Sequence, residues 1–167
     1  MTNKCKTISN YIINEVNLYN KDKDLNNTVF LSTKRLNKIL FFCDLRYMLL
    51  NNGKPMLDDK FYVWSSGPVI PELYREYLCF QDGEMKTIRV EEVFLDDDIK
   101  GVIDEILEIT KNLDTIELIN LCKLDWFSND VLNEPISKAD IYANYSYIID
   151  KLFEVKKDKE KKLSIKW

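Results

Sequence analysis

The sequence predicts a mainly α-helical fold: a compact multi-helix domain around one central buried helix, with a short β-hairpin or strand near residues 84–95. Apolar residues recur at helical spacing in several segments, helix start signals precede these segments, and only one brief stretch alternates. With 167 residues, 46% of them hydrophobic, the chain can bury a sizeable core as one domain. We expect this domain to span residues 1–153, followed by a lysine-rich C-terminal tail over residues 154–167 that frays or is flexible.

The central helix is predicted within the segment STKRLNKILFFCDLRYMLLNNGKP. Ser32 or Thr33 can cap its start, and Gly53 with Pro55 supplies a stop. Its apolar stripe follows the i, i+3, i+4, i+7 pattern: Leu36, Ile39, Leu40, Cys43, Tyr47 and Leu50. The positions beside the stripe are also apolar: Phe41, Phe42, Leu45 and Met48. We therefore expect other helices to surround this one.

Local signals predict the remaining helices in chain order. Residues 8–16 form an amphipathic first helix, and the polar stretch 20–27 is a loop. Three aspartates at 96–98 begin a helix whose apolar face runs to Thr110. Asp114 and Glu117 stand at capping-box spacing before a short helix. Ser137 as N-cap, with Ile136 and Ile141 as a hydrophobic staple, begins the last helix, whose stripe reaches residue 152.

Composition excludes several kinds of chemistry. The chain has no histidine, so histidine general bases, Ser-His-Asp and Cys-His catalysis and histidine zinc sites are excluded. Its four cysteines are far apart and are interpreted as reduced, mostly buried thiols. We expect no catalytic residues, no cofactor and no metal. No apolar run is long enough to span a membrane and no signal-peptide pattern is present, which predicts a cytoplasmic protein without membrane contact.

The charge is unevenly distributed. The formal net charge is −4, yet residues 151–167 hold seven lysines against three acids, which leaves 17 basic and 25 acidic side chains in the first 150 residues. An acidic body argues against sequence-specific nucleic-acid binding. It either complements a basic partner or is an ordinary solvated surface. The basic tail is either a solvated end or a flexible arm for an acidic partner, a protease or nucleic acid.

The segment WSSGPVIPELY at residues 64–74 concentrates two of the four prolines, one of the four glycines and one of the three tryptophans. Pro71 suits the first turn of a helix over ELYREYLCF because its missing N–H is unpaired there anyway. Gly67 before Pro68 favours an extended or turn conformation and lets the backbone pass close to a neighbour such as Trp64. We interpret the segment as a rigid corner, which either serves structure alone or also forms a partner-binding elbow.

Three ordered motifs then resemble the SocA-like antitoxin domain, also called the Panacea domain, once a phage-associated domain of unknown function. The family patterns are a helix of the type KLLYFAQ, then GKPLF, then AW..GPV.P.LY. The first two patterns match Lys38, Ile39, Leu40, Phe41, Phe42, Gly53, Pro55, Met56 and Leu57. The third matches Trp64, Gly67, Pro68, Val69, Pro71, Leu73 and Tyr74. The order and separation of these elements make the resemblance specific.

The resemblance extends over roughly residues 4–150. IELINLCKLDWF is similar to a late family segment that ends in tryptophan, here Trp126. Where members often carry a histidine before that tryptophan, this chain has Cys122 or Lys123. The resemblance thus marks the residues of the third motif, together with Trp126, as candidate partner-binding residues.

The resemblance implies a non-enzymatic antitoxin that neutralises a toxin encoded beside it by direct binding, with delivery to a bacterial AAA+ protease as one route. A phage or mobile-element regulator that binds a host protein is the alternative. A small carboxylate enzyme near Asp58, Asp59 and Tyr62 is a weaker one. The toxin, the binding face and the oligomeric state are not evident from the sequence.

Overall fold

The computed structural model describes residues 1–80, 83–85, 94–123 and 132–164. The helices in these ranges are α1 (Asn3–Asn20), α2 (Thr33–Leu50), α3 (Pro71–Glu76), α4 (Asp97–Thr110), α5 (Thr115–Cys122) and α6 (Lys138–Ser164), with 3-10 turns η1 (Leu25–Asn27) and η2 (Leu78–Phe80). Strands β1 (Tyr62–Trp64) and β2 (Gly67–Val69) form a small antiparallel sheet. The prediction of a mainly α fold is confirmed. None of the described helices is long and apolar enough to cross a membrane.

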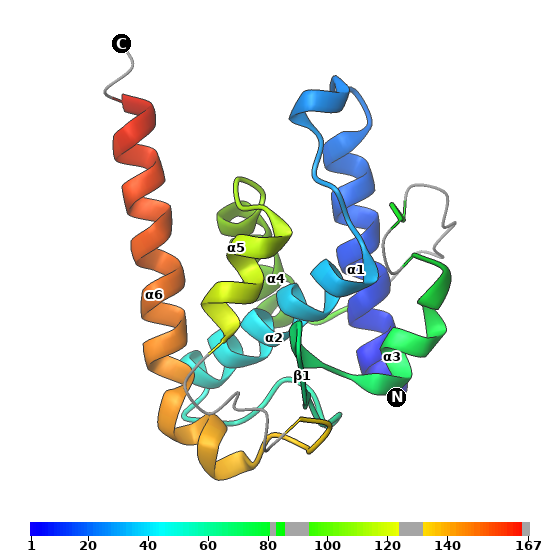
Figure 1. Ribbon diagram of the computed structural model, residues 1–167, viewed down its shortest axis with the longest axis vertical. Helices are drawn as coiled ribbons and strands as arrows, with labels where there is room; N and C mark the ends of the chain where they lie inside the picture. The colour runs from blue at the N-terminus through cyan, green and yellow to red at the C-terminus, as the bar shows by residue number, and fades with distance from the viewer. Residues whose placement is uncertain (81–82, 86–93, 124–131, 165–167) are drawn as a thin grey trace.

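Helix α2 is the centre of the molecule, as its doubly apolar pattern predicts. It contacts α1, α3, α4, α5, α6 and β2, and Figure 1 shows α1 and α6 on opposite sides of it. Phe41, Phe42, Leu45 and Met48 are buried together with most of the predicted stripe. The buried stripe ends before the last residue of the helix, because Leu50 is 55% exposed.

The predicted starts of α2, α5 and α6 are confirmed, whereas the first helix begins earlier than predicted, at Asn3. The Ser32 hydroxyl accepts the N–H of Arg35, so Ser32 is the N-cap of α2. Asp114 and Glu117 make both bonds of a capping box at α5. Ser137 accepts the N–H of Asp140 at the start of α6. Each of these bonds satisfies a backbone N–H that has no partner inside the helix.

Three expectations need correction or remain open. The helix after Pro71 is shorter than predicted, since α3 ends at Glu76 and η2 follows, which leaves Leu78 52% exposed instead of packed beside Leu73. Helix α6 continues through residue 153 to Ser164 and rises past α5 (Figure 1), so the predicted start of the tail is not a helix end. The alternating residues Ile88, Val90 and Val93 lie outside the described residues.

A candidate partner-binding corner and a neighbouring groove

The segment predicted as a corner is a tight β-hairpin that leads into α3. Trp64 pairs with Gly67 across the turn at Ser65 and Ser66. Gly67 has a φ of 90°, a conformation that residues with a Cβ rarely adopt. A Cβ at this position would lie 3.2 Å from Cε of Lys38. Glycine is therefore favoured here both by the backbone conformation and by the close approach of the Lys38 side chain.

Proline is compatible with the middle of β2 because the backbone N–H and carbonyl of the facing residue, Val63, form their hydrogen bonds with another segment. Val63 is the register partner of Pro68. The Val63 N–H donates to Glu134 O at 2.9 Å, and the Val63 carbonyl accepts the Asn133 N–H at 2.7 Å. Pro68, which has no N–H, thus removes no hydrogen bond between the two strands.

Buried polar side chains of α2 hold the corner in place. The Lys38 ammonium donates to Pro68 O at 2.8 Å, and the Ile70 N–H donates to Asn37 Oδ1 at 2.9 Å. At the far end of α3 the Thr33 hydroxyl donates to Tyr77 O at 2.6 Å. All three side chains are fully buried, so water does not compete for these bonds. The corner has a fixed position relative to α2.

Lys38 is an unusual support because it is a cation with no exposed surface. Burial lowers the pKa of its ammonium from 10.5 to about 8. Burial also raises the pKa of the adjacent Cys122 thiol, to about 12. At neutral pH the lysine is therefore charged beside a protonated thiol, and its bond to Pro68 O is charge-assisted.

The corner divides the candidate residues into supporting and surface residues. Gly67, Pro68, Val69 and Leu73 are buried, whereas Trp64, Pro71 and Tyr74 are partly exposed. The rings of Trp64 and Tyr74 meet edge to face with centroids 5.0 Å apart. We name Trp64, Pro71 and Tyr74 the aromatic corner. The eighth candidate, Trp126, lies outside the described residues.

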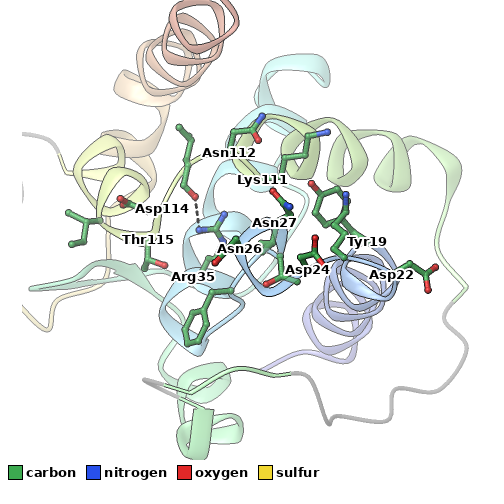
Figure 2. Close-up of a pocket in the computed structure, with 16 residues that line it drawn as sticks. Tyr19, Asp22, Asp24, Asn26, Asn27, Arg35, Lys111, Asn112, Asp114 and Thr115 are labelled. Atoms are coloured by element: carbon green, nitrogen blue, oxygen red, sulfur yellow. Dashed lines mark hydrogen bonds between the residues drawn. The ribbon is translucent and has the colours of Figure 1, made fainter. Parts of the chain in front are cut away.

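A groove of about 910 Å³ opens between the α1–α2 connection and the α4–α5 turn (Figure 2). Tyr19, Phe30 and Ile116 line it and are 36%, 47% and 69% exposed. The ammonium of Lys23 lies 4.0 Å from the centre of the Tyr19 ring. The groove combines apolar side chains with charges of both signs and is a second surface on which a protein partner could be tested.

Arg35 closes the floor of this groove and lies between its two walls in Figure 2. Its guanidinium donates to Thr110 O and Leu113 O, both at 2.8 Å, at the carboxyl end of α4. Burial lowers its pKa to about 10. Its Nε has no hydrogen-bond partner in the part of the chain that the structure describes. The contacts with the end of α4 indicate a structural role, because a cation stabilises the carbonyl end of a helix.

The described residues offer little for catalysis. They contain no group of three His, Cys, Asp or Glu side chains that could hold a metal ion. Three of the cysteines are buried, and burial raises the pKa of each thiol, so they are poor nucleophiles. Asp58 and Asp59 do line a small cavity with Asp44, but Tyr62 is not among its lining residues. The constellation predicted for a carboxylate enzyme is thus only partly assembled.

Sequence reasoning missed the polar supports of α2. Asn37 and Asp44 are seven residues apart and therefore lie on the same side of the helix. Asp44 accepts the N–H groups of Met56 and Leu57, which belong to the second motif. Lys38 follows Asn37 and directly precedes the apolar run Ile39–Cys43. Polar residues within a helix that is apolar all round are the signal that could have identified them, since buried polar groups need partners.

Together these features define a mainly α-helical domain whose central helix fixes a surface corner through buried hydrogen bonds. The chain belongs to the SocA-like antitoxin family, because the family model described as "Antitoxin SocA-like, Panacea domain" matches residues 36–127. This match covers α2 from Leu36 onwards, the hairpin, α3, α4 and α5. Comparisons with curated proteins and with solved structures gave no match. Family membership indicates an antitoxin-like domain, a toxin partner in general terms and a non-enzymatic role.

Proposed function

We propose that this protein is an antitoxin that neutralises a protein toxin by binding it through the aromatic corner. The observation that carries the proposal is the partly exposed Trp64–Tyr74 pair, at 5.0 Å between ring centroids, on a hairpin held by buried hydrogen bonds. Tryptophan and tyrosine are the residues most often found at the energetic centre of protein interfaces. Membership in an antitoxin family supplies the kind of partner.

Rigidity favours the corner over the groove as the contact surface. A preformed surface loses less conformational entropy on binding than one that must become ordered. The corner meets this condition because Lys38 and Asn37 fix both sides of the turn from β2 into α3. Its aromatic side chains project from this fixed backbone. They can therefore serve as anchors for the toxin.

The test is co-expression of this chain with the product of the adjacent gene in a bacterium, followed by growth measurement and co-purification. We expect rescue of growth and a stable complex. A corner variant carrying Trp64→Ala and Tyr74→Ala should weaken the complex by at least about 30-fold, which is the loss expected if only one of the two truncated anchors contributes about 2 kcal/mol. A groove variant carrying Phe30→Ala and Ile116→Ala is the matched control and should bind like the wild type.

The outcomes separate the possible routes of neutralisation. Rescue with a stable complex supports occlusion of the toxin in the cytoplasm. Rescue without a complex, with toxin levels falling only when a AAA+ protease is present, supports delivery to that protease. A folded corner variant that still rescues growth would exclude the aromatic corner as the binding surface. A harmless neighbour that never binds would favour a phage or mobile-element regulator directed at a host protein.

A further inference from the structure

A small cavity lies between the end of α2, the segment 55–61 and the start of α6. Its volume is about 180 Å³. Most of its wall is apolar and is formed by Met48, Pro55, Leu57, Phe61, Ile136, Ile141 and Tyr142. Tyr142 is 50% exposed, so part of this apolar wall faces solvent. None of these residues belongs to the aromatic corner or to the groove.

A carboxylate that uses only one of its two oxygens for hydrogen bonds with the described residues stands among these apolar side chains. Asp44 lines the cavity and is only 4% exposed. Its Oδ1 accepts the N–H groups of Met56 at 2.7 Å and Leu57 at 2.9 Å. Its Oδ2 receives no hydrogen bond from residues 1–80, 83–85, 94–123 or 132–164. Burial raises the pKa of this carboxyl to about 6, although the N–H groups of Leu57 and Met56 and the positive charge of Lys4 act to lower it.

The other charged groups at the cavity do not satisfy Asp44. The Asp59 carboxylate is already occupied by the N–H and the hydroxyl of Thr2. Asp58, Lys60 and Lys138 are exposed, so their charged ends are solvated. No ion pair joins Asp44 to either lysine in the described part of the chain. Asp44 is thus a buried carboxylate beside apolar walls that forms no ion pair with the described residues, although the more distant charge of Lys4 acts on it.

We propose that this cavity receives a lysine or arginine side chain of a protein partner, with the cationic end at Asp44 Oδ2 and the aliphatic stem against the apolar walls. Long cationic side chains have this division between an apolar stem and a charged end. The half-exposed Tyr142 ring offers apolar surface that a protein partner would cover and a free amine would not. Residues 1–150 hold 25 acidic and only 17 basic side chains, and this negative charge favours a basic partner.

The proposal goes beyond the antitoxin function because it concerns a different surface and a definite chemistry, and it can be tested without the toxin. The probe is Nα-acetyl-lysine methylamide, titrated into the full chain and followed by the NMR signals of Met48 and Tyr142. Nα-acetyl-norleucine methylamide is the matched control, since it has an aliphatic stem without the ammonium. We expect the lysine probe to bind at least about tenfold more tightly than the norleucine probe.

Asp44→Asn is the informative variant. An asparagine oxygen can still accept the N–H groups of Met56 and Leu57, while the amide NH₂ replaces the oxygen that would meet the cation. We expect the preference for the lysine probe to disappear. Lys138→Gln removes an exposed competing cation and should strengthen binding of the lysine probe about twofold or more.

Three results would overturn the proposal: equal affinity of the two probes for the wild-type chain, an unchanged preference in a folded Asp44→Asn chain, or tighter binding of cadaverine than of the lysine probe. The last result would assign the cavity to a free diamine. The comparison of probes on the wild-type chain needs no substitution, so it decides the matter even if Asp44→Asn fails to fold. Rescue by co-expression remains an independent measurement of the antitoxin function.

Discussion

The substitution Lys38→Met tests whether the corner is held by a buried cation. In the folded protein the pKa of Lys38 is about 8 rather than 10.5, because burial disfavours the charged ammonium. This difference corresponds to about 3 kcal/mol of destabilisation while the lysine is charged in both states. Methionine has a similar length and no charge. It removes this penalty but also leaves Pro68 O without its donor, at a cost of about 1–3 kcal/mol.

The sign of the pH dependence follows from the lowered pKa. Between about pH 8 and 10.5 the unfolded chain binds more protons at this residue than the folded chain. The free energy of unfolding of the wild type therefore rises with pH in this window, and the contribution from Lys38 grows by about 2.5 kcal/mol between pH 7 and 10. Cys122, its neighbour, keeps its proton throughout, since burial raises the thiol pKa to about 12.

The assay is urea denaturation of the wild type and of Lys38→Met at pH 7, 8, 9 and 10. The other titrating groups contribute equally to the free energies of unfolding of both proteins, so their contributions cancel in the difference between wild type and Lys38→Met. At pH 7 we expect Lys38→Met to be as stable as the wild type or up to about 2 kcal/mol more stable, and between pH 7 and 10 this difference should shift by about 2.5 kcal/mol in favour of the wild type. Lys162→Met, on the exposed end of α6, is the control and should show no such trend. A constant difference between wild type and Lys38→Met across this range would refute a buried charged lysine.

Three further predictions concern stability and are measured by urea denaturation at pH 7. Gly67→Ala should cost about 1–2 kcal/mol because of the positive φ, whereas the exposed Gly101→Ala in α4, with open space around it, should stabilise by about 1 kcal/mol; equal effects would contradict the conformational argument. Leu152 in α6 has a fully buried side chain, so Leu152→Ala should lower the free energy of unfolding by about 2–5 kcal/mol, and a smaller loss would show that α6 packs loosely. Lys159→Ala breaks a part-exposed ion pair with Glu117 and should cost less than about 1 kcal/mol, so a loss above 2 kcal/mol would contradict a weak surface pair.

Features set by neighbouring residues could be predicted from the sequence. A helix cap depends on residues within three positions of each other, as at Ser32, Asp114 and Ser137, and all three caps are confirmed. Pro71 occupies the first turn of α3 for the same local reason. The burial of α2 also follows from its own composition, since apolar residues on every side need surrounding helices.

Features set by distant residues could not be predicted. The strands β1 and β2 have three residues each, too few to show alternation, and their pairing depends on Gly67. Arg35 contacts carbonyls more than 70 residues away, so nothing near it in the sequence indicates its role. The charge of the lysine-rich end of α6 predicts a tail, whereas in the structure the helix continues to Ser164 and Lys159 donates to Asn112 O, 47 residues away in the chain.

The division of the corner into buried and exposed residues has a consequence for partner choice. The family match spans residues 36–127, and within it Lys38, Gly67 and Pro68 act on one another inside the molecule. Lys38 donates to the carbonyl of Pro68, and the missing side chain of Gly67 leaves space for Lys38. These residues are therefore constrained by packing whatever the partner is. Trp64 and Tyr74 are under weaker internal constraint, since both are partly exposed. Both nevertheless belong to the family pattern AW..GPV.P.LY, so the proposed contact through this pair would be common to the family, and surface residues around the corner would have to distinguish one toxin from another.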